Sequence, residues 1–148
     1  MRNFNIEPKY DYTLRPAWTI KNKICKEARY VRQCGEPGRL AIFLMQFEPY
    51  YSDTKNPILF VDNTKLQDDL IGNKTFEKDL HNYVMAIVDS FEEYLSNMYE
   101  KGKVITNLKV TISDLYIHPA DSSEMCYRIA TYLGMKAILS DVNLVLLT

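Results

Sequence analysis

The sequence predicts an α+β fold, in which a mixed, mostly antiparallel sheet is covered mainly on one face by amphipathic helices. Residues 75–101 carry an apolar stripe at helical spacing. Residues 104–112 alternate between apolar and polar side chains, and residues 39–47 form a nearly continuous apolar run typical of a buried central strand. Strands that follow one another directly favour antiparallel pairs. A length of 148 residues fits one globular domain over 1–148.

The first predicted helix spans about residues 19–33 and is basic. Lysines and arginines lie opposite a set of apolar residues that recur every three or four positions. These apolar residues are Ile20, Ile24, Ala28 and Val31. The sequence Gly-Glu-Pro-Gly at residues 35–38 ends the helix. Before it, alternation over residues 10–14 predicts a short strand that ends at Pro16.

The middle of the chain is predicted to add one strand, one short helix and a bulge. Residues 58–61 form the strand, and the short helix begins at Asn63 or Thr64 and ends at Gly72. The alternation that starts at residue 104 reverses its parity near residues 113–114. This reversal predicts a β-bulge, because one extra residue turns the following side chains to the other face.

The last third of the chain is predicted to hold a third helix and two strands. Residues 121–124, Asp-Ser-Ser-Glu, resemble a capping box that opens a helix over about 121–134. Gly134 is expected to close this helix. Residues 136–148 are expected to form two short strands that turn near residues 140–141.

Positive charge is concentrated in the first quarter of the chain. Residues 1–39 hold nine lysines and arginines against four acidic residues (+5), whereas residues 40–148 hold nine against fifteen (−6). The basic helix face could contact phosphates, and tyrosines in the loop after residue 47 offer interface anchors. The candidate partner-binding residues are Lys21, Lys26, Arg29, Arg32, Tyr50 and Tyr51.

Three interpretations of this basic face remain open from the sequence. It is a solvated helix face partly paired with the acidic side of residues 75–101, a protein contact, or a nucleic-acid contact. An isoelectric point near 6.1 disfavours a dedicated nucleic-acid binder.

A candidate polar or anion-binding site lies where the bulged strand ends and the third helix begins. It consists of His118, Asp121, Ser122 and Ser123, since a histidine, a carboxylate and two hydroxyls fall within six residues. The competing interpretation is structural. In that case Asp121 or Ser122 caps the helix, and His118 lies on the surface or bonds to the backbone.

The sequence predicts no catalytic residues, no metal and no cofactor. Gly35 and Gly38 are the closest pair of glycines, and no strand, glycine-rich loop and helix surround them, which disfavours ATP and NAD. Three cysteines without Cys-x-x-Cys spacing predict reduced thiols rather than disulfides or a zinc site.

The leading functional hypothesis is a small non-enzymatic protein that binds another macromolecule, with a protein as the first choice. It would be an inhibitor, adaptor or accessory factor, and a composition typical of AT-rich codons favours a phage or mobile element. The alternatives are a nucleic-acid-binding accessory protein that uses residues 15–39 and a small enzyme centred on His118 and Asp121. No apolar run reaches the roughly 20 residues of a membrane span, so a cytoplasmic location without membrane contact is expected. The sequence does not indicate whether the protein is a monomer or an oligomer.

Overall fold

The computed structural model describes residues 2–6, 16–33, 38–54 and 57–147. Its helices are α1 (Lys74–Glu100) and α2 (Glu124–Ile138), with a 3-10 turn η2 (Asp68–Leu70). Its strands are β1 (Arg2–Asn5), β2 (Ala17–Ile20), β3 (Ile24–Arg32), β4 (Arg39–Pro49), β5 (Ile58–Asp62), β6 (Val104–Ile105), β7 (Leu108–Tyr116) and β8 (Leu144–Leu146). The predicted strand over residues 10–14 lies outside the described residues, and the sequence pattern does not predict β1.

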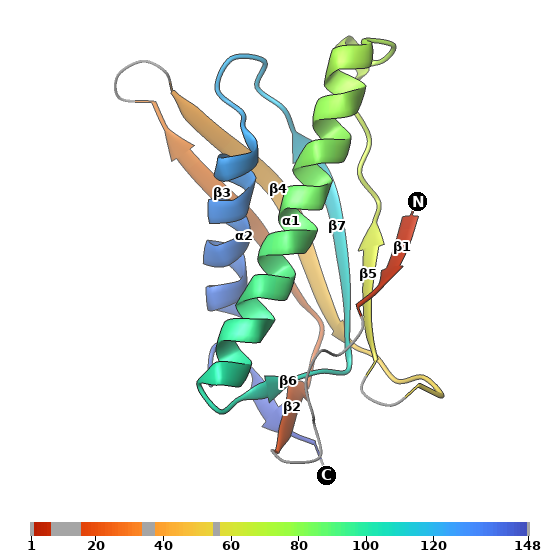
Figure 1. The fold of residues 1–148 in the computed structure, drawn as a ribbon, viewed down its shortest axis with the longest axis vertical. Coiled ribbons are helices and arrows are strands. Elements are labelled where there is room, and N and C mark those ends of the chain that lie inside the picture. Colours follow the sequence, from red (N-terminus) through yellow and green to blue (C-terminus); the bar gives the residue numbers. More distant parts are fainter. Residues whose placement is uncertain (1, 7–15, 34–37, 55–56, 148) are drawn as a thin grey trace.

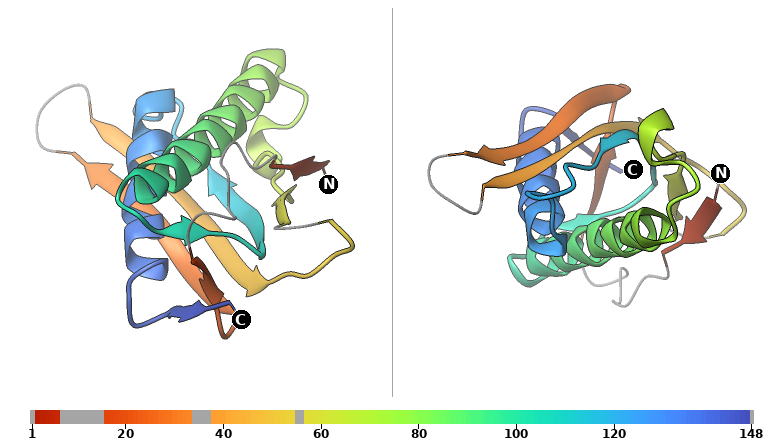
Figure 2. Two further views of the ribbon diagram at one scale, coloured as in Figure 1. Left: turned by 60° about the horizontal axis from the view of Figure 1, so that its bottom comes forward. Right: turned by 90° about the horizontal axis from the view of Figure 1, so that it is seen from above.

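The strands form two sheets, with the order β1-β5-β7-β4-β3 in the larger and β6-β2-β8 in the smaller. In the larger sheet β5 and β7 run parallel, and the other three pairs are antiparallel. Both helices cover one face of this sheet (Figures 1 and 2). The predicted α+β class, with a mixed, mostly antiparallel sheet and helices on one face, is confirmed.

The parallel pair is joined by α1 in an unusual way. In Figure 1 the chain leaves β5 on the right, passes through α1 in front of the sheet and enters β7 on the left. The crossover is therefore left-handed, whereas nearly all strand–helix–strand connections between parallel strands are right-handed. The handedness of a crossover cannot be predicted from the local pattern of apolar and polar residues.

Helix α1 confirms the prediction for residues 75–101. It begins where the Asn73 side chain accepts the amide protons of Thr75 and Phe76. It ends before Gly102, whose φ of 89° suits glycine. Its Phe91 is fully buried and packs edge-on against aromatic rings of β4 and β5, at 6.2 and 5.6 Å between ring centroids.

The predicted basic helix over residues 19–33 is wrong. These residues form the end of β2 and all of β3, which pairs with β4 from Ile24 opposite Phe47 to Arg32 opposite Arg39. The apolar spacing suits a helix, but pairing with the strongly apolar β4 satisfies the backbone of both strands at once. Long-range pairing therefore overrides the local helical pattern.

The third helix also differs from its prediction at both ends. It begins at Glu124 and runs through Gly134 to Ile138. Gly134 does not end the helix; it provides space, because a Cβ there would lie 2.6 Å from the Met45 sulfur and 3.3 Å from the Ala28 Cβ. A single strand, β8, follows in the described residues instead of the two predicted.

The remaining predictions for the middle of the chain give mixed results. The short helix predicted between residues 63 and 72 is observed only as the 3-10 turn η2.

The predicted bulge is confirmed, since the β4–β7 register shifts between Ile42 and Leu44 and Asp114 has a φ of 50°. The predicted central strand is confirmed as β4, although it is fully buried only on its helix-facing side. The buried side chains on that side are Ala41, Phe43, Met45 and Phe47.

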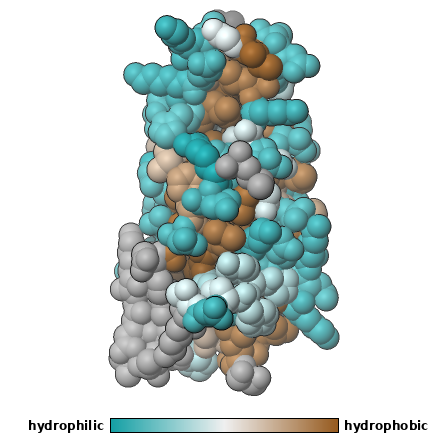
Figure 3. Space-filling model, turned by 90° about the vertical axis from the view of Figure 1, so that its right-hand side faces the viewer, coloured by the Kyte–Doolittle hydropathy of each residue, from teal (hydrophilic) through white to brown (hydrophobic). Residues whose placement is uncertain are grey.

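The core lies between the sheet and the two helices and reaches the β1 edge of the molecule. Figure 3 views this side, where apolar surface forms a band bordered by hydrophilic residues. Phe4 of β1 packs edge-on against Phe60 of β5, at 6.3 Å between centroids. Over the described residues, no helix is long and apolar enough to cross a membrane.

Candidate functional site

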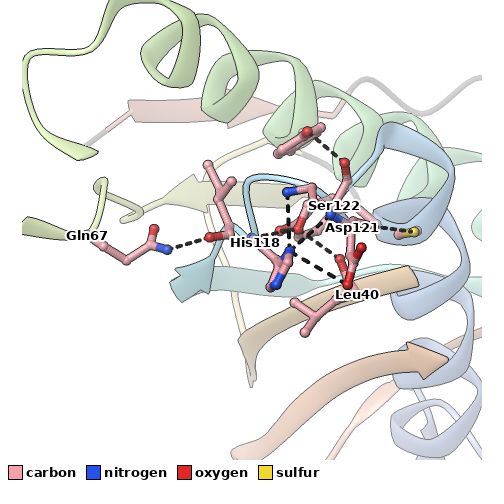
Figure 4. Close-up of polar contacts among 10 residues, drawn as sticks. Leu40, Gln67, His118, Asp121 and Ser122 are labelled. Atoms are coloured by element: carbon pink, nitrogen blue, oxygen red, sulfur yellow. Dashed lines mark hydrogen bonds and ion pairs between the residues drawn. The ribbon is translucent and has the colours of Figure 1, made fainter. Parts of the chain in front are cut away.

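The loop between β7 and α2, residues 117–123, folds around the ring of His118. The Nδ1 atom of this ring accepts the amide protons of Ala120 at 3.2 Å and of Asp121 at 3.0 Å. The hydroxyl of Ser122 accepts the amide proton of His118 at 2.9 Å. His118, Asp121 and Ser122 therefore turn toward one another, as Figure 4 shows. The structure brings together three of the four residues of the candidate polar site.

Strand β4 holds this loop through two backbone contacts. The Ser122 hydroxyl donates to the Leu40 carbonyl at 2.9 Å, and the Leu40 amide donates to the Asp121 carbonyl at 3.1 Å. Gly38 lies directly under the Asp121 carboxylate, where a Cβ would be only 2.6 Å from Oδ2. A glycine at this position lets the start of β4 approach the loop closely.

The two helices contact the loop and the end of β7 through a pair of tyrosines. Tyr83 of α1 and Tyr127 of α2 stack with ring centroids 4.6 Å apart. The Tyr83 hydroxyl donates to the Ser122 carbonyl at 3.2 Å, and the Tyr127 hydroxyl donates to the Tyr116 carbonyl. Burial raises the pKa of Tyr83 to about 12 and also raises the pKa of Tyr127. Both phenols therefore stay protonated donors at neutral pH.

Two further residues define the edges of the loop. Gln67 donates its side-chain amide to the Ile117 carbonyl at 2.8 Å, while its Oε1 is buried without a partner among the described residues. Ser123 accepts the amide proton of Cys126 at 3.3 Å and so caps α2. The cap is therefore Ser123, and not Asp121 or Ser122 as the structural interpretation expected.

The predicted partner-binding residues of the basic segment are spread along β3 rather than gathered on a helix face. Lys26 and Arg32 lie on the helix-facing side of the sheet, because they alternate with the buried Ala28. Arg29 points to the opposite side and contacts Glu27 at 3.3 Å. Lys21 is exposed in the turn before β3. Of these four residues, only Arg32 reaches the end of the sheet that carries the 117–123 loop.

That end of the sheet carries two arginines. Arg32 and Arg39 stand directly opposite each other as the last pair of the β3–β4 ladder, and both are exposed. A hydrogen bond to the Tyr30 hydroxyl at 3.4 Å raises the pKa of Arg39. Figure 1 shows the end of β3, the start of β4 and the 117–123 loop toward one end of the long axis. We call Arg32, Arg39 and residues 117–123 the tip.

One acidic residue of α1 forms an ion pair with α2. Asp89 of α1 contacts Arg128 of α2 at 3.4 Å. The expected pairing of two helix faces does not occur in that form, because residues 19–33 are strands.

The two candidate tyrosines lie far from the tip. Tyr50 and Tyr51 follow the opposite end of β4, an 11-residue strand that spans about 34 Å. Tyr51 is 65% exposed, whereas Tyr50 is half-buried and donates its amide to the Asn107 carbonyl. The predicted partner-binding residues are therefore distributed over the length of the sheet, with Arg32 at one end and the two tyrosines at the other.

The Nδ1 atom of His118 is occupied by two amides, and the Asp121 carboxylate stays 3.7 Å from it. This carboxylate does not orient the ring as the acid of a catalytic triad would. Within the described part of the chain, no group of three or more histidine, cysteine or acidic residues is placed to hold a metal ion.

Several residues that shape the tip are not found by sequence reasoning. Gly38, Leu40, Tyr83 and Tyr127 act through backbone atoms or buried hydroxyls of distant elements. The sequence Gly-Glu-Pro-Gly at residues 35–38 is a local signal for this position, since Gly38 is part of it.

Comparison with known proteins assigns the chain to a family. Residues 17–143 match the family model described as elongation factor G, domain IV. Elongation factor G of Fervidobacterium nodosum is 30% identical over 129 residues, which cover 87% of this chain and 17% of that protein. A crystal structure of a protein from Thermus thermophilus matches with a TM-score of 0.62 and 21% identity over 88% of this chain and 18% of that one. The chain spans about a sixth of the length of these relatives.

Proposed function

The chain belongs to the family of elongation factor G, domain IV, and we therefore propose that it acts in translation by presenting its tip to RNA. The RNA would belong to the ribosome or to a tRNA bound there, and the protein would work in the cytoplasm. The observation that carries this proposal is the extent of the family match. It runs from β2 through both helices to the residue before β8.

The family match contradicts the function expected from composition and charge. An inhibitor, adaptor or accessory factor of a phage or mobile element is wrong, because the chain is homologous to part of a translation factor. The absence of catalytic and nucleotide-binding motifs led to that expectation. It is equally consistent with a chain that matches about a sixth of a longer translation factor, and the absence of a motif does not distinguish these two cases.

The arrangement of charge at the tip supports RNA as the partner. Arg32 and Arg39 are like charges directly opposite each other on paired strands, an arrangement that costs stability. Guanidinium groups form strong hydrogen bonds with phosphate oxygens. A phosphate placed between these residues would relieve their repulsion, and the 117–123 loop would lie beside it.

The opposite end of the molecule provides a matched comparison. Lys101 follows α1 and Lys136 lies in the last turn of α2, both exposed, near the smaller sheet. They carry the same charge as the tip arginines and lie at the C-terminal ends of the two helices, which point away from the 117–123 loop. A contact made by the tip should depend on the arginines and not on these lysines.

Sedimentation with purified ribosomes at several salt concentrations tests the proposal. The double variant Arg32→Glu/Arg39→Glu is expected to bind roughly 10-fold to 100-fold more weakly and to show a shallower salt dependence, because it loses two phosphate contacts. The variant Lys101→Glu/Lys136→Glu, with the same change in net charge, should bind like the wild type. Equal losses in both variants, or no binding of the wild-type chain at low salt, would refute the proposal.

A further inference from the structure

The outer edge of β3 presents a row of backbone groups that no other described strand pairs with. Strand β3 is the last strand of the larger sheet, and among the described residues it pairs only with β4. In a strand that is paired on one side, every second residue directs its N–H and C=O groups away from the partner. Over Ile24–Arg32 these groups are available to another strand. Figure 1 shows this edge on the left of the sheet.

Basic side chains follow the same edge at intervals of three residues. They are Lys26, Arg29 and Arg32, all exposed, and the one acidic residue of the strand is Glu27, which contacts Arg29 at 3.3 Å. Lys26 and Arg32 lie on the helix-facing side of the sheet and Arg29 on the other side. A strand added to this edge would therefore meet positive charge on both of its faces.

Helix α2 adds an apolar side chain beside this edge. Its Gly134 faces Ala28 of β3, and its Arg128 faces α1. Successive residues of a helix are rotated by about 100°, which places Leu133 on the flank of α2 that faces away from α1. The Leu133 side chain is 44% exposed. An apolar side chain opposite Ala28 on an added strand would lie near Leu133.

Two other occupants suit this edge less well. A second copy of β3 would bring the same excess of three basic residues over one acidic residue, and like charges on paired strands repel each other. RNA offers phosphates to the basic side chains, but it has no row of amide donors and carbonyl acceptors at the spacing of a strand. An extended acidic peptide offers both the charge and the backbone groups.

We propose that the free edge of β3 binds an extended acidic segment of a partner protein, which joins the larger sheet as an additional strand. Main-chain hydrogen bonds would supply affinity, and acidic side chains at every third position would supply specificity. In an antiparallel pairing these acidic residues lie opposite Arg32, Arg29 and Lys26 in turn. The proposal goes beyond RNA binding by the tip and does not depend on it, since Lys26 and Arg29 lie outside the tip.

A synthetic peptide of three Glu-Val-Thr repeats, which has the length of β3, tests the pairing. In the antiparallel pairing its glutamates meet the three basic residues, and its central valine lies opposite Ala28. Every second amide of residues 24–32 should exchange rapidly with solvent in the free protein. At a peptide concentration about tenfold above the dissociation constant, the exchange of these amides should slow by about tenfold. Binding of the peptide without this protection would overturn the proposal.

The contribution of charge is tested on the protein side. Lys26→Glu is expected to lower the affinity for the peptide by about tenfold, because an attraction is replaced by a repulsion. Lys101→Glu, with the same change in charge at an exposed site after α1, should bind like the wild type. A peptide of three Lys-Val-Thr repeats should not bind. Equal affinities of the wild type and Lys26→Glu would contradict the proposal.

The contribution of the backbone is tested on the peptide, with the wild-type protein. Methyl groups are placed on alternate peptide nitrogens, in two peptides that carry complementary sets. Only one set faces β3, so one peptide should lose binding and the other should keep it. Equal binding of the two peptides would show that charge alone holds the peptide, and would overturn the proposal.

Two further results would assign the edge to a different occupant and so overturn the proposal. One is binding of a short oligouridine that Lys26→Glu abolishes, with no binding of the acidic peptide. The other is a dimer in analytical ultracentrifugation whose β3 amides are protected without peptide. Ribosome sedimentation reports on the tip separately, so a failure there with peptide protection intact would refute the proposed function alone.

Discussion

At the scale of single residues, the tip depends on close contacts between β4 and the 117–123 loop. Gly38 and Ser122 make these contacts without contributing charge. The first allows the Asp121 carboxylate to lie against the strand, and the second joins the loop to the Leu40 carbonyl. The two roles can be tested separately, because Gly38 provides space for the carboxylate and Ser122 provides hydrogen bonds.

Gly38→Ala is expected to lower the free energy of unfolding by about 1–2 kcal/mol, the usual cost of an added methyl group in a packed site. The new Cβ would lie 2.6 Å from Asp121 Oδ2 and 2.9 Å from its Cγ. Urea titration measures the loss. The same substitution in an Asp121→Ala background should cost much less, and equal costs in both backgrounds would refute the contact.

Ser122→Ala is expected to cost about 1–2 kcal/mol, because it leaves the His118 amide and the Leu40 carbonyl without their partner. Hydrogen exchange should become faster at His118. Ser123→Ala is the matched control, since it removes a neighbouring hydroxyl that caps α2 instead. The control should speed exchange in the first turn of α2 and leave His118 unchanged.

At the scale of elements, the packing of α2 on the sheet and on α1 positions the tip. The helix approaches β3 and β4 closely at Gly134, where Ala28 and Met45 fill the space. Its first turns carry Tyr127, which stacks on Tyr83 beneath the loop. A shift of α2 would therefore move the loop as well.

Gly134→Ala tests the close approach of the helix to the sheet. Alanine favours a helix by about 1 kcal/mol over glycine, whereas overpacking costs about 1–3 kcal/mol. We expect a net loss of about 1 kcal/mol in urea titrations. Ala137→Gly, at an exposed site of the same helix, measures the propensity term alone. A net gain in stability from Gly134→Ala would contradict the packing described for α2.

The tyrosine pair predicts a loss of stability at alkaline pH. Burial raises the pKa of both phenols in the folded protein, and that of Tyr83 reaches about 12. The unfolded chain releases these protons near about pH 10, so above that pH the folded state binds more protons and loses stability as the pH rises. Thermal unfolding from about pH 8 to about pH 11 should show this decline, and Tyr127→Phe should make it shallower. Tyr51→Phe, at an exposed site, should follow the wild type.

The same scale explains how much of the fold could be predicted. The extent of α1 follows from its own periodicity and its Asn73 cap, and the bulge at Asp114 follows from alternation within one strand. The prediction of a helix over residues 19–33 is wrong because this segment is stabilised as strand β3 by its pairing with β4. The prediction that Gly134 ends the helix is wrong for a related reason. The residues that require a glycine there, Ala28 and Met45, are distant in the sequence.

At the scale of the whole molecule, one end carries the tip and the other carries the smaller sheet. Sequence reasoning identified His118, Asp121 and Ser122 because they lie close together in the chain. It could not place Arg32 and Arg39 beside them, because their proximity depends on strand pairing and on the Leu40 contacts. In the described residues, the basic side chains of the first quarter are distributed over β1, the turn before β3, β3 itself and the start of β4, and only Arg32 and Arg39 lie at the tip.

Photo-crosslinking from the two ends of the molecule decides whether the tip is the part that meets RNA. A benzoylphenylalanine would replace Gln33, the exposed residue after Arg32, or Lys136 near the smaller sheet. With ribosomes, the probe at residue 33 should crosslink to RNA, and the probe at residue 136 should give little or none. RNA crosslinks from residue 136 without any from residue 33, on a protein that still sediments with ribosomes, would show that the tip is not the RNA-binding end.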